Sequence, residues 1–68
     1  MYYNSKNGYE GTFKKSYFSG LKHYDLTIFK DGKMVYHCTY SQPLTEDGFR
    51  KEVDEFPELL KILMKEGE

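Results

Sequence analysis

Apolar and aromatic residues alternate with polar ones along the first forty residues of the chain, in three separate runs. The runs cover residues 9–15, 21–29 and 34–40. A period of two is typical of a strand with one buried face. Asp31-Gly32, between the second and third runs, is the strongest signal for a hairpin in the chain. The pattern therefore predicts a three-stranded antiparallel sheet.

The turn at Asp31-Gly32 allows two registers between the second and third strands. A two-residue loop sets Ile28 opposite Val35, whereas a three-residue loop sets Ile28 opposite Met34. The second choice gathers the apolar and aromatic groups of both strands on one face, and a slip of one residue would scatter them. We therefore predict the three-residue loop.

Beyond Pro43 the spacing of apolar residues changes to that of a helix. The repeating positions are Phe49, Val53, Phe56, Leu60 and Leu63. Intervals of three and four place them on one helix face. Thr45 is a plausible N-cap, because its hydroxyl can accept a hydrogen bond from the first turn. The ring of Pro57 would clash with the preceding turn, so the helix is predicted to kink or break there.

These patterns predict an α+β fold in a single domain, residues 1–68, with the C-terminal helix packed on one face of the sheet. A chain of 68 residues buries a small fraction of its surface, and such chains rely on disulfides, metals or partner subunits. Cys38 is the only cysteine, which excludes an internal disulfide. A partner subunit is therefore the expected device, and the predicted helix also carries apolar residues outside the repeating positions on its inner face. These residues favour a homodimer. The predicted subunit contact consists of Leu59, Ile62, Leu63 and Met64.

The net charge of −1 conceals two halves of opposite sign. Residues 1–40 carry six lysines and three carboxylates, whereas residues 41–68 carry eight carboxylates and four basic side chains. On the predicted helix, Asp47, Asp54 and Glu58 share a face opposite the apolar stripe, about 10 Å and 6 Å apart along the axis. Such a row is either a solvated surface or an imitation of a DNA backbone.

Few residues point to catalysis or to a metal. No Ser-His-Asp or Cys-His arrangement can be assigned from spacing, and no glycine-rich phosphate loop is present. In the predicted register Asp25 falls opposite His37, which is either a base with its orienting carboxylate or an exposed charge pair. A zinc site would need Cys38 with both histidines and a carboxylate, without the spacing typical of zinc sites. We expect no enzyme activity, cofactor or metal.

The tyrosines and lysines of the predicted strands suggest another kind of binding. They are Tyr9, Phe13, Tyr17, Tyr24, Tyr36 and Tyr40, beside Lys14, Lys15, Lys22, Lys30 and Lys33. Exposed aromatic rings on a sheet stack unpaired bases, and lysines hold phosphates. Alternatively, these rings form the core beneath the helix. Because the chain has one arginine and an acidic second half, we expect no direct binding of nucleic acid.

Several short motifs resemble the small phage-encoded uracil-DNA glycosylase inhibitors. They are His-Tyr-Asp-Leu-Thr-Ile-Phe at 23–29, Asp-Gly-Lys at 31–33, Tyr36, and Leu-Thr-Glu-Asp-Gly-Phe at 44–49, within a match over roughly residues 24–63. The resemblance implies a homodimer that imitates DNA and blocks a host glycosylase. It implies that Phe49 matches the aromatic side chain that, in this family, fills the apolar pocket that otherwise grips the DNA-intercalating leucine of the enzyme. By its spacing alone, Phe49 is equally a core residue.

We therefore hypothesise a small cytoplasmic, phage-type inhibitor of uracil-DNA glycosylase. Its predicted partner-binding residues are Phe49, Glu46, Asp47, Asp54 and Glu58. The alternatives are a single-stranded nucleic-acid-binding module that uses the tyrosine- and lysine-rich sheet, and a protein-interaction module with an unrelated partner. A cytoplasmic location is expected because the chain shows no signal-like segment and its one thiol fits a reducing compartment.

Overall fold

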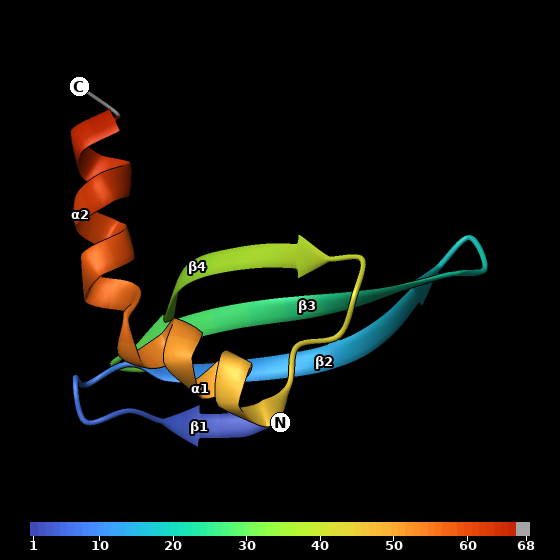
Figure 1. Ribbon diagram of the computed structural model, residues 1–68, viewed down its shortest axis with the longest axis horizontal. Coiled ribbons are helices and arrows are strands. Elements are labelled where there is room, and N and C mark those ends of the chain that lie inside the picture. The colour runs from blue at the N-terminus through green and yellow to red at the C-terminus, as the bar shows by residue number, and fades with distance from the viewer. Residues whose placement is uncertain (67–68) are drawn as a thin grey trace.

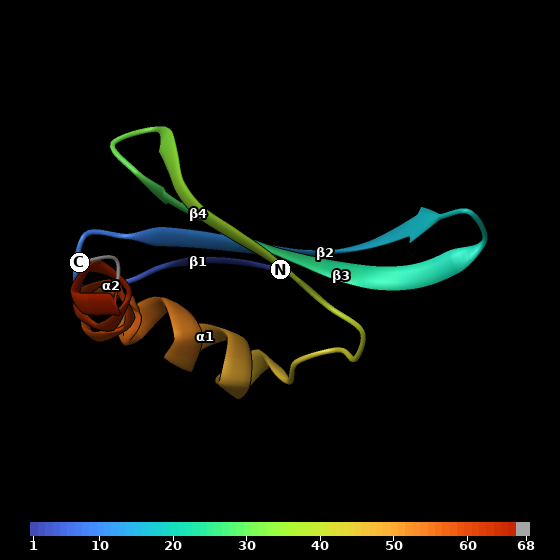
Figure 2. The ribbon, with the colours of Figure 1, turned by 90° about the horizontal axis from the view of Figure 1, so that it is seen from above.

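Two helices lie on one side of an antiparallel sheet (Figure 1 and Figure 2). The computed structural model describes residues 1–66, with side chains as far as Leu63. In these residues the sheet has four strands in chain order, β1 (Tyr2–Asn4), β2 (Glu10–Phe18), β3 (Leu21–Lys30) and β4 (Lys33–Tyr40). The helices are α1 (Glu46–Asp54) and α2 (Phe56–Glu66). The predicted α+β class and antiparallel sheet are therefore confirmed.

The sheet has one strand more than the predicted three. β1 pairs with β2, so that Tyr3 lies opposite Gly11. The loop after β1 holds it to the helices, because the Asn7 side-chain amide donates to the carbonyls of Val53 and Asp54, each at 2.9 Å. Carbonyls at a helix end have no partner within the helix, so this loop completes the end of α1. Three residues are too few to show an alternating pattern, which is why the sequence did not predict β1.

The turn at Asp31-Gly32 is a two-residue loop, so the predicted three-residue loop is wrong. Lys30 pairs directly with Lys33 across the turn. Asp31 and Gly32 have φ angles of 53° and 78°. Positive φ at both central residues defines the type I′ turn, whose twist matches that of the flanking strands.

A register shift next to this turn restores the predicted inner face. The pairing moves by one residue between Ile28 and Phe29, so that Ile28 faces Tyr36 rather than Val35 or the predicted Met34. A one-residue bulge of this kind exchanges the faces of a strand. Met34 consequently points to the outer face and is 63% exposed.

α1 begins as predicted, and the break near Pro57 divides the expected helix into two. Thr45 is the N-cap of α1, and its hydroxyl accepts a hydrogen bond from the Gly48 N–H at 3.0 Å. α1 ends at Asp54, and Pro57 lies in the first turn of α2, where a missing N–H costs little. Only α1 lies along the sheet, whereas α2 runs crosswise to the strands and extends beyond the β4 edge (Figure 1).

The core lies between α1, the start of α2 and the inner face of the sheet. Its buried residues are Phe13, Leu26, Ile28, Phe49, Val53 and Phe56. Gly11 lies at the closest approach of sheet and helix, because a β-carbon there would overlap Cγ2 of Val53 and lie 3.3 Å from Cε1 of Phe49. Glycine is therefore needed at this position for the close approach of α1 rather than for its backbone freedom.

Replacing Gly11 by alanine tests this contact. Gly11→Ala should lower the free energy of unfolding by about 1–3 kcal/mol, because the new methyl group overpacks the core. In a Val53→Ala background the space is free, and the same substitution should be nearly neutral. Urea denaturation of the four proteins of this double-mutant cycle measures both costs. Equal costs in the two backgrounds would show that Gly11 and Val53 do not limit the approach.

Candidate functional site

The β2–β3 hairpin extends beyond the end of β4 and beyond the start of α1 (Figure 1). We call this projecting part, residues 16–23, the arm. β4 ends at Tyr40, which pairs with Tyr24, so that no third strand of residues 1–66 accompanies the arm. Its own two strands pair as far as Phe18 and Leu21. The arm therefore presents side chains to solvent on both of its faces.

Aromatic and basic side chains cover the arm and its base. The exposed members are Lys14, Lys15, Tyr17, Phe18 and Lys22, and the aliphatic Leu21 is exposed beside them. Phe18 is 74% exposed and Tyr17 64%. Nζ of Lys15 lies 6.0 Å from the centroid of the Tyr17 ring. Residues 11–24 contain no Asp or Glu, so the local potential is positive and favours an anionic partner.

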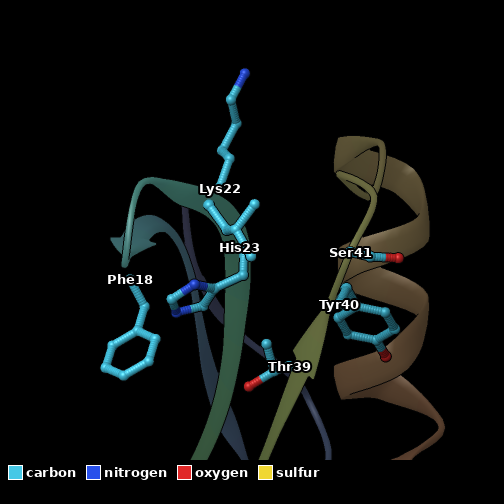
Figure 3. A pocket seen from close by; sticks show the side chains of 7 residues that line it. Phe18, Lys22, His23, Thr39, Tyr40 and Ser41 are labelled. Atoms are coloured by element: carbon cyan, nitrogen blue, oxygen red, sulfur yellow. The ribbon is translucent and has the colours of Figure 1, made fainter.

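A groove lies between the arm and the end of β4 (Figure 3). Its volume is about 460 Å³, and it is lined by residues 39–41 and by Phe18, Leu21, Lys22 and His23 of the arm. The groove is present because the chain leaves β3 after Tyr40, while β3 extends further beside β2.

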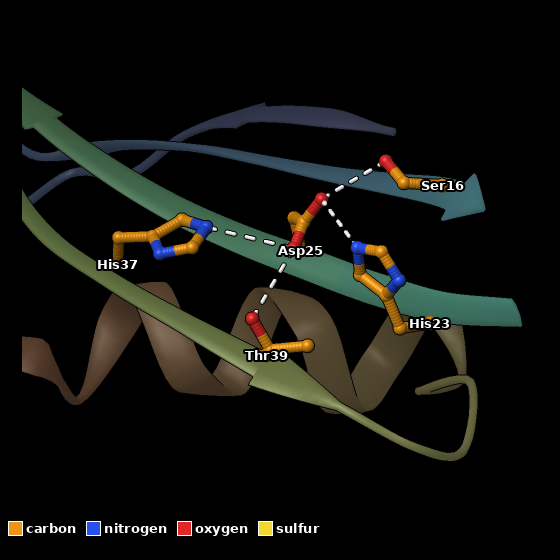
Figure 4. A network of polar contacts seen from close by, with 5 residues as sticks. All are labelled: Ser16, His23, Asp25, His37 and Thr39. Carbon is orange, nitrogen blue, oxygen red and sulfur yellow. Dashed lines mark hydrogen bonds and ion pairs between the residues drawn. The ribbon is translucent and has the colours of Figure 1, made fainter. Parts of the chain in front are cut away.

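A cluster of polar side chains surrounds Asp25 on the outer face of the sheet (Figure 4). Ser16 Oγ donates to Oδ2 of Asp25 at 2.9 Å, and Thr39 Oγ1 donates to Oδ1 at 3.3 Å. Nε2 of His23 and Nε2 of His37 each lie 3.6 Å from a carboxylate oxygen. The hydrogen bond from Ser16, followed by the nearby histidines, lowers the pKa of Asp25 against the opposing effect of desolvation.

The cluster differs from the predicted pairing of Asp25 with His37. Thr39 lies opposite Asp25, because the register is shifted by two residues from the predicted one, and His37 reaches the carboxylate diagonally. Both hydroxyl groups donate to the carboxylate. A nucleophile would instead need a basic group as its partner. The described residues also contain no group of three His, Cys, Asp or Glu side chains arranged to hold a metal ion.

Phe49 lies in the core, so its predicted role as an exposed anchor is wrong. The residue is 1% exposed, and its ring centroid lies 6.0 Å from that of Phe13. The same helical spacing that places Val53 against the sheet places Phe49 there. The alternative interpretation of Phe49 as the first core residue of the stripe is correct.

The predicted row of carboxylates is divided between two helices. Asp47 and Asp54 lie on α1, whereas Glu58 lies on α2, which runs in a different direction (Figure 1). All three are exposed, but the axial spacing predicted for one continuous helix does not apply. Glu46 is exposed and forms an ion pair with Arg50 at 2.7 Å, which reduces the negative charge of the first turn.

Asp54 has a structural role that the sequence did not indicate. Its Oδ1 accepts hydrogen bonds from the Tyr3 hydroxyl at 2.9 Å and the Ser5 hydroxyl at 2.5 Å. These bonds, with the Ser5 bond contributing most, lower the pKa of Asp54. The carboxylate therefore joins β1 and the following loop to the end of α1. Contacts between residues some fifty positions apart leave no periodic signal in a sequence.

The predicted subunit contact is only partly exposed. Ile62 is 55% exposed and Leu63 40%, and both lie on α2. Leu59 is half-buried and packs against the core. The side chain of Met64 lies outside the described residues.

No protein-family model, curated protein or solved structure matches this chain. The resemblance to the glycosylase inhibitors therefore stays a prediction from the quoted motifs. In the described residues, no helix combines the length and the apolar character that crossing a membrane requires.

The two hydrogen-bonded aspartates predict a loss of stability in acid. Folding lowers the pKa of Asp25 and of Asp54, so each adds stability that is present above the ordinary carboxyl pKa near 4 and is lost as pH falls through the lowered value. Asp54→Asn should therefore reduce the stability at neutral pH and reduce the further loss on acidification. Urea denaturation at neutral and acid pH measures both.

Asp47→Asn is the matched control, because it removes an exposed carboxylate from the same helix. It should leave the pH dependence close to that of the unsubstituted protein. If both variants lose stability on acidification to the same extent as the parent, the hydrogen bonds of Asp54 do not stabilise the fold.

Proposed function

We propose that the protein is a non-catalytic binding protein whose arm binds single-stranded nucleic acid. The observation that supports this proposal is the exposure of Tyr17 and Phe18 on the arm, which also carries Lys22, has Lys14 and Lys15 at its base, and contains no carboxylate. Stacking of a base on an aromatic ring contributes about 1–3 kcal/mol and tolerates any base. Lysines add a salt-dependent attraction to the phosphates. Rings and charges on one narrow hairpin suit a flexible single strand better than a rigid duplex.

The acidic half of the chain is not an obstacle to this proposal. From the sequence we expected no direct binding of nucleic acid, because carboxylates outnumber basic side chains beyond residue 40. In the folded protein α1 lies on the inner side of the sheet, and the arm projects past its start (Figure 2). Exposed charges further apart than about 8 Å are largely screened at physiological salt. A strand bound along the arm therefore meets Lys22, and at the base of the arm Lys14 and Lys15, rather than the carboxylates of α1.

The proposal predicts binding to a short fluorescein-labelled oligothymidylate, measured by fluorescence anisotropy at low salt. Phe18→Ala should weaken binding by about tenfold or more, because one stacking platform is lost. Lys22→Ala should reduce the slope of log affinity against log salt by about 0.7, the value for one phosphate contact on a single strand. The exposed Lys61 on α2 provides a control, and Lys61→Ala should leave the slope unchanged.

Two results would contradict the proposal. One is the absence of any salt-dependent binding by the unsubstituted protein. The other is binding that Lys61→Ala weakens as much as Lys22→Ala does, because the attraction would then be non-specific.

A second candidate function is a homodimeric inhibitor of uracil-DNA glycosylase that imitates DNA. It is supported by the exposed carboxylates of Asp47 and Asp54 on α1 and by exposed apolar Ile62 and Leu63 on α2. Because Phe49 is buried, this inhibitor would hold its target through carboxylates rather than through an aromatic anchor. The apolar end of α2 would then be covered by the second subunit, as buried apolar surface stabilises association.

An excision assay with a purified bacterial glycosylase tests the second candidate. A molar excess of the protein should slow the release of uracil from DNA, and Asp47→Asn should relieve part of that inhibition. Sedimentation should give the mass of a dimer, and Ile62→Lys should shift it toward the monomer. Excision at full speed excludes this target, and a monomeric parent protein excludes the predicted subunit contact.

A further inference from the structure

We propose that the groove between the arm and the end of β4 holds a single base of a bound strand, with Lys22 on the adjoining phosphate. This inference rests on the proposed binding of single-stranded nucleic acid by the arm. It adds a defined subsite to an otherwise sequence-tolerant surface. An isolated nucleoside monophosphate then carries both of the groups that the subsite recognises, the base and the phosphate.

The walls of the groove suit a planar ring. Phe18, His23 and Thr39 lie together on one side of the sheet (Figure 3). Phe18 offers an exposed ring face, and the His23 ring is fixed from behind by its contact with Asp25 at 3.6 Å. Unpaired bases bind to proteins by stacking on aromatic and histidine rings of this kind. A volume of about 460 Å³ is ample for one base with its sugar.

Polar groups at the rim can contact the edge of the base. Thr39 and Ser41 both line the groove. The Thr39 hydroxyl donates its proton to Asp25, so it presents only its acceptor lone pairs to a ligand. Ser41 is exposed, and its hydroxyl is able to donate or accept. Base edges carry both donors and acceptors, and this pair of hydroxyls can satisfy either kind.

The charge around the groove favours a phosphate. Lys22 is exposed at its edge (Figure 3). The nearest carboxylate along β3, Asp25, already accepts hydrogen bonds from Ser16 and Thr39 and lies beside both histidines. Both of its oxygens are therefore occupied by hydrogen bonds within the protein, and among the described residues the lining of the groove includes Lys22 but no carboxylate.

Ligand-observed NMR titrations with adenosine 5′-monophosphate, adenosine and inorganic phosphate test the subsite. The unsubstituted protein should bind the monophosphate more tightly than adenosine, and phosphate alone most weakly. Phe18→Leu keeps an apolar side chain but removes the ring, and it should weaken both nucleoside ligands by about fivefold or more. Lys22→Gln should reduce the affinity for the monophosphate to that for adenosine. Lys33→Gln, at the start of β4 and far from the groove along the sheet, should change the affinity for neither nucleoside ligand.

The outcomes separate this subsite from the wider proposed function. If oligothymidylate binds but the monophosphate does not, or if Phe18→Leu leaves its affinity unchanged, the subsite is wrong and the function of the arm stands. If no nucleic acid binds, both are wrong. If, in amide spectra of the ¹⁵N-labelled protein without ligand, the line widths of the groove residues depend on protein concentration, a second copy of the chain occupies the groove, which also overturns the subsite.

Discussion

The packing of α1 against Gly11 determines where every other part of the molecule lies. Phe49 and Val53 can reach the sheet only because position 11 has no side chain. Once they are buried, Glu46 and Asp47 of α1 are left exposed to solvent, and the helix packs on β2 at this point. The strongest apolar stripe of the chain is therefore buried in the core of the protein itself. An interface role for Phe49 would require this contact to open.

The remaining surface divides into three parts with different chemistry. The outer face of the sheet is covered by no helix in the described part of the chain (Figure 2), and the hydroxyls of Ser16 and Thr39 donate hydrogen bonds to the carboxylate of Asp25 there. The side of α1 that faces solvent carries carboxylates, some of them paired within the protein. The arm carries Lys22 and the exposed rings of Tyr17 and Phe18. These two rings do not pack against the core, which is why binding is assigned to the arm.

Local patterns in the sequence predicted the elements of the fold, whereas long-range contacts escaped them. Alternation gave the three long strands, and the residue types at Thr45 and Pro57 gave the start of α1 and the break before α2. β1 is held by the contacts of Asp54 with residues some fifty positions earlier, which no local pattern records. The helical spacing placed Phe49 on the apolar face of α1, but it did not show whether that face packs on the sheet or on a partner. The arm was missed because strand periodicity does not reveal where a neighbouring strand stops.

The central claim is that binding belongs to the arm and not to the acidic helix. A titration of ¹⁵N-labelled protein with unlabelled oligothymidylate, followed by amide chemical shifts, tests it most directly. The account predicts that the largest shifts fall within residues 14–23 and 39–41, with little change along α1. Shifts concentrated on residues 46–54, or no shifts at any concentration, would contradict it.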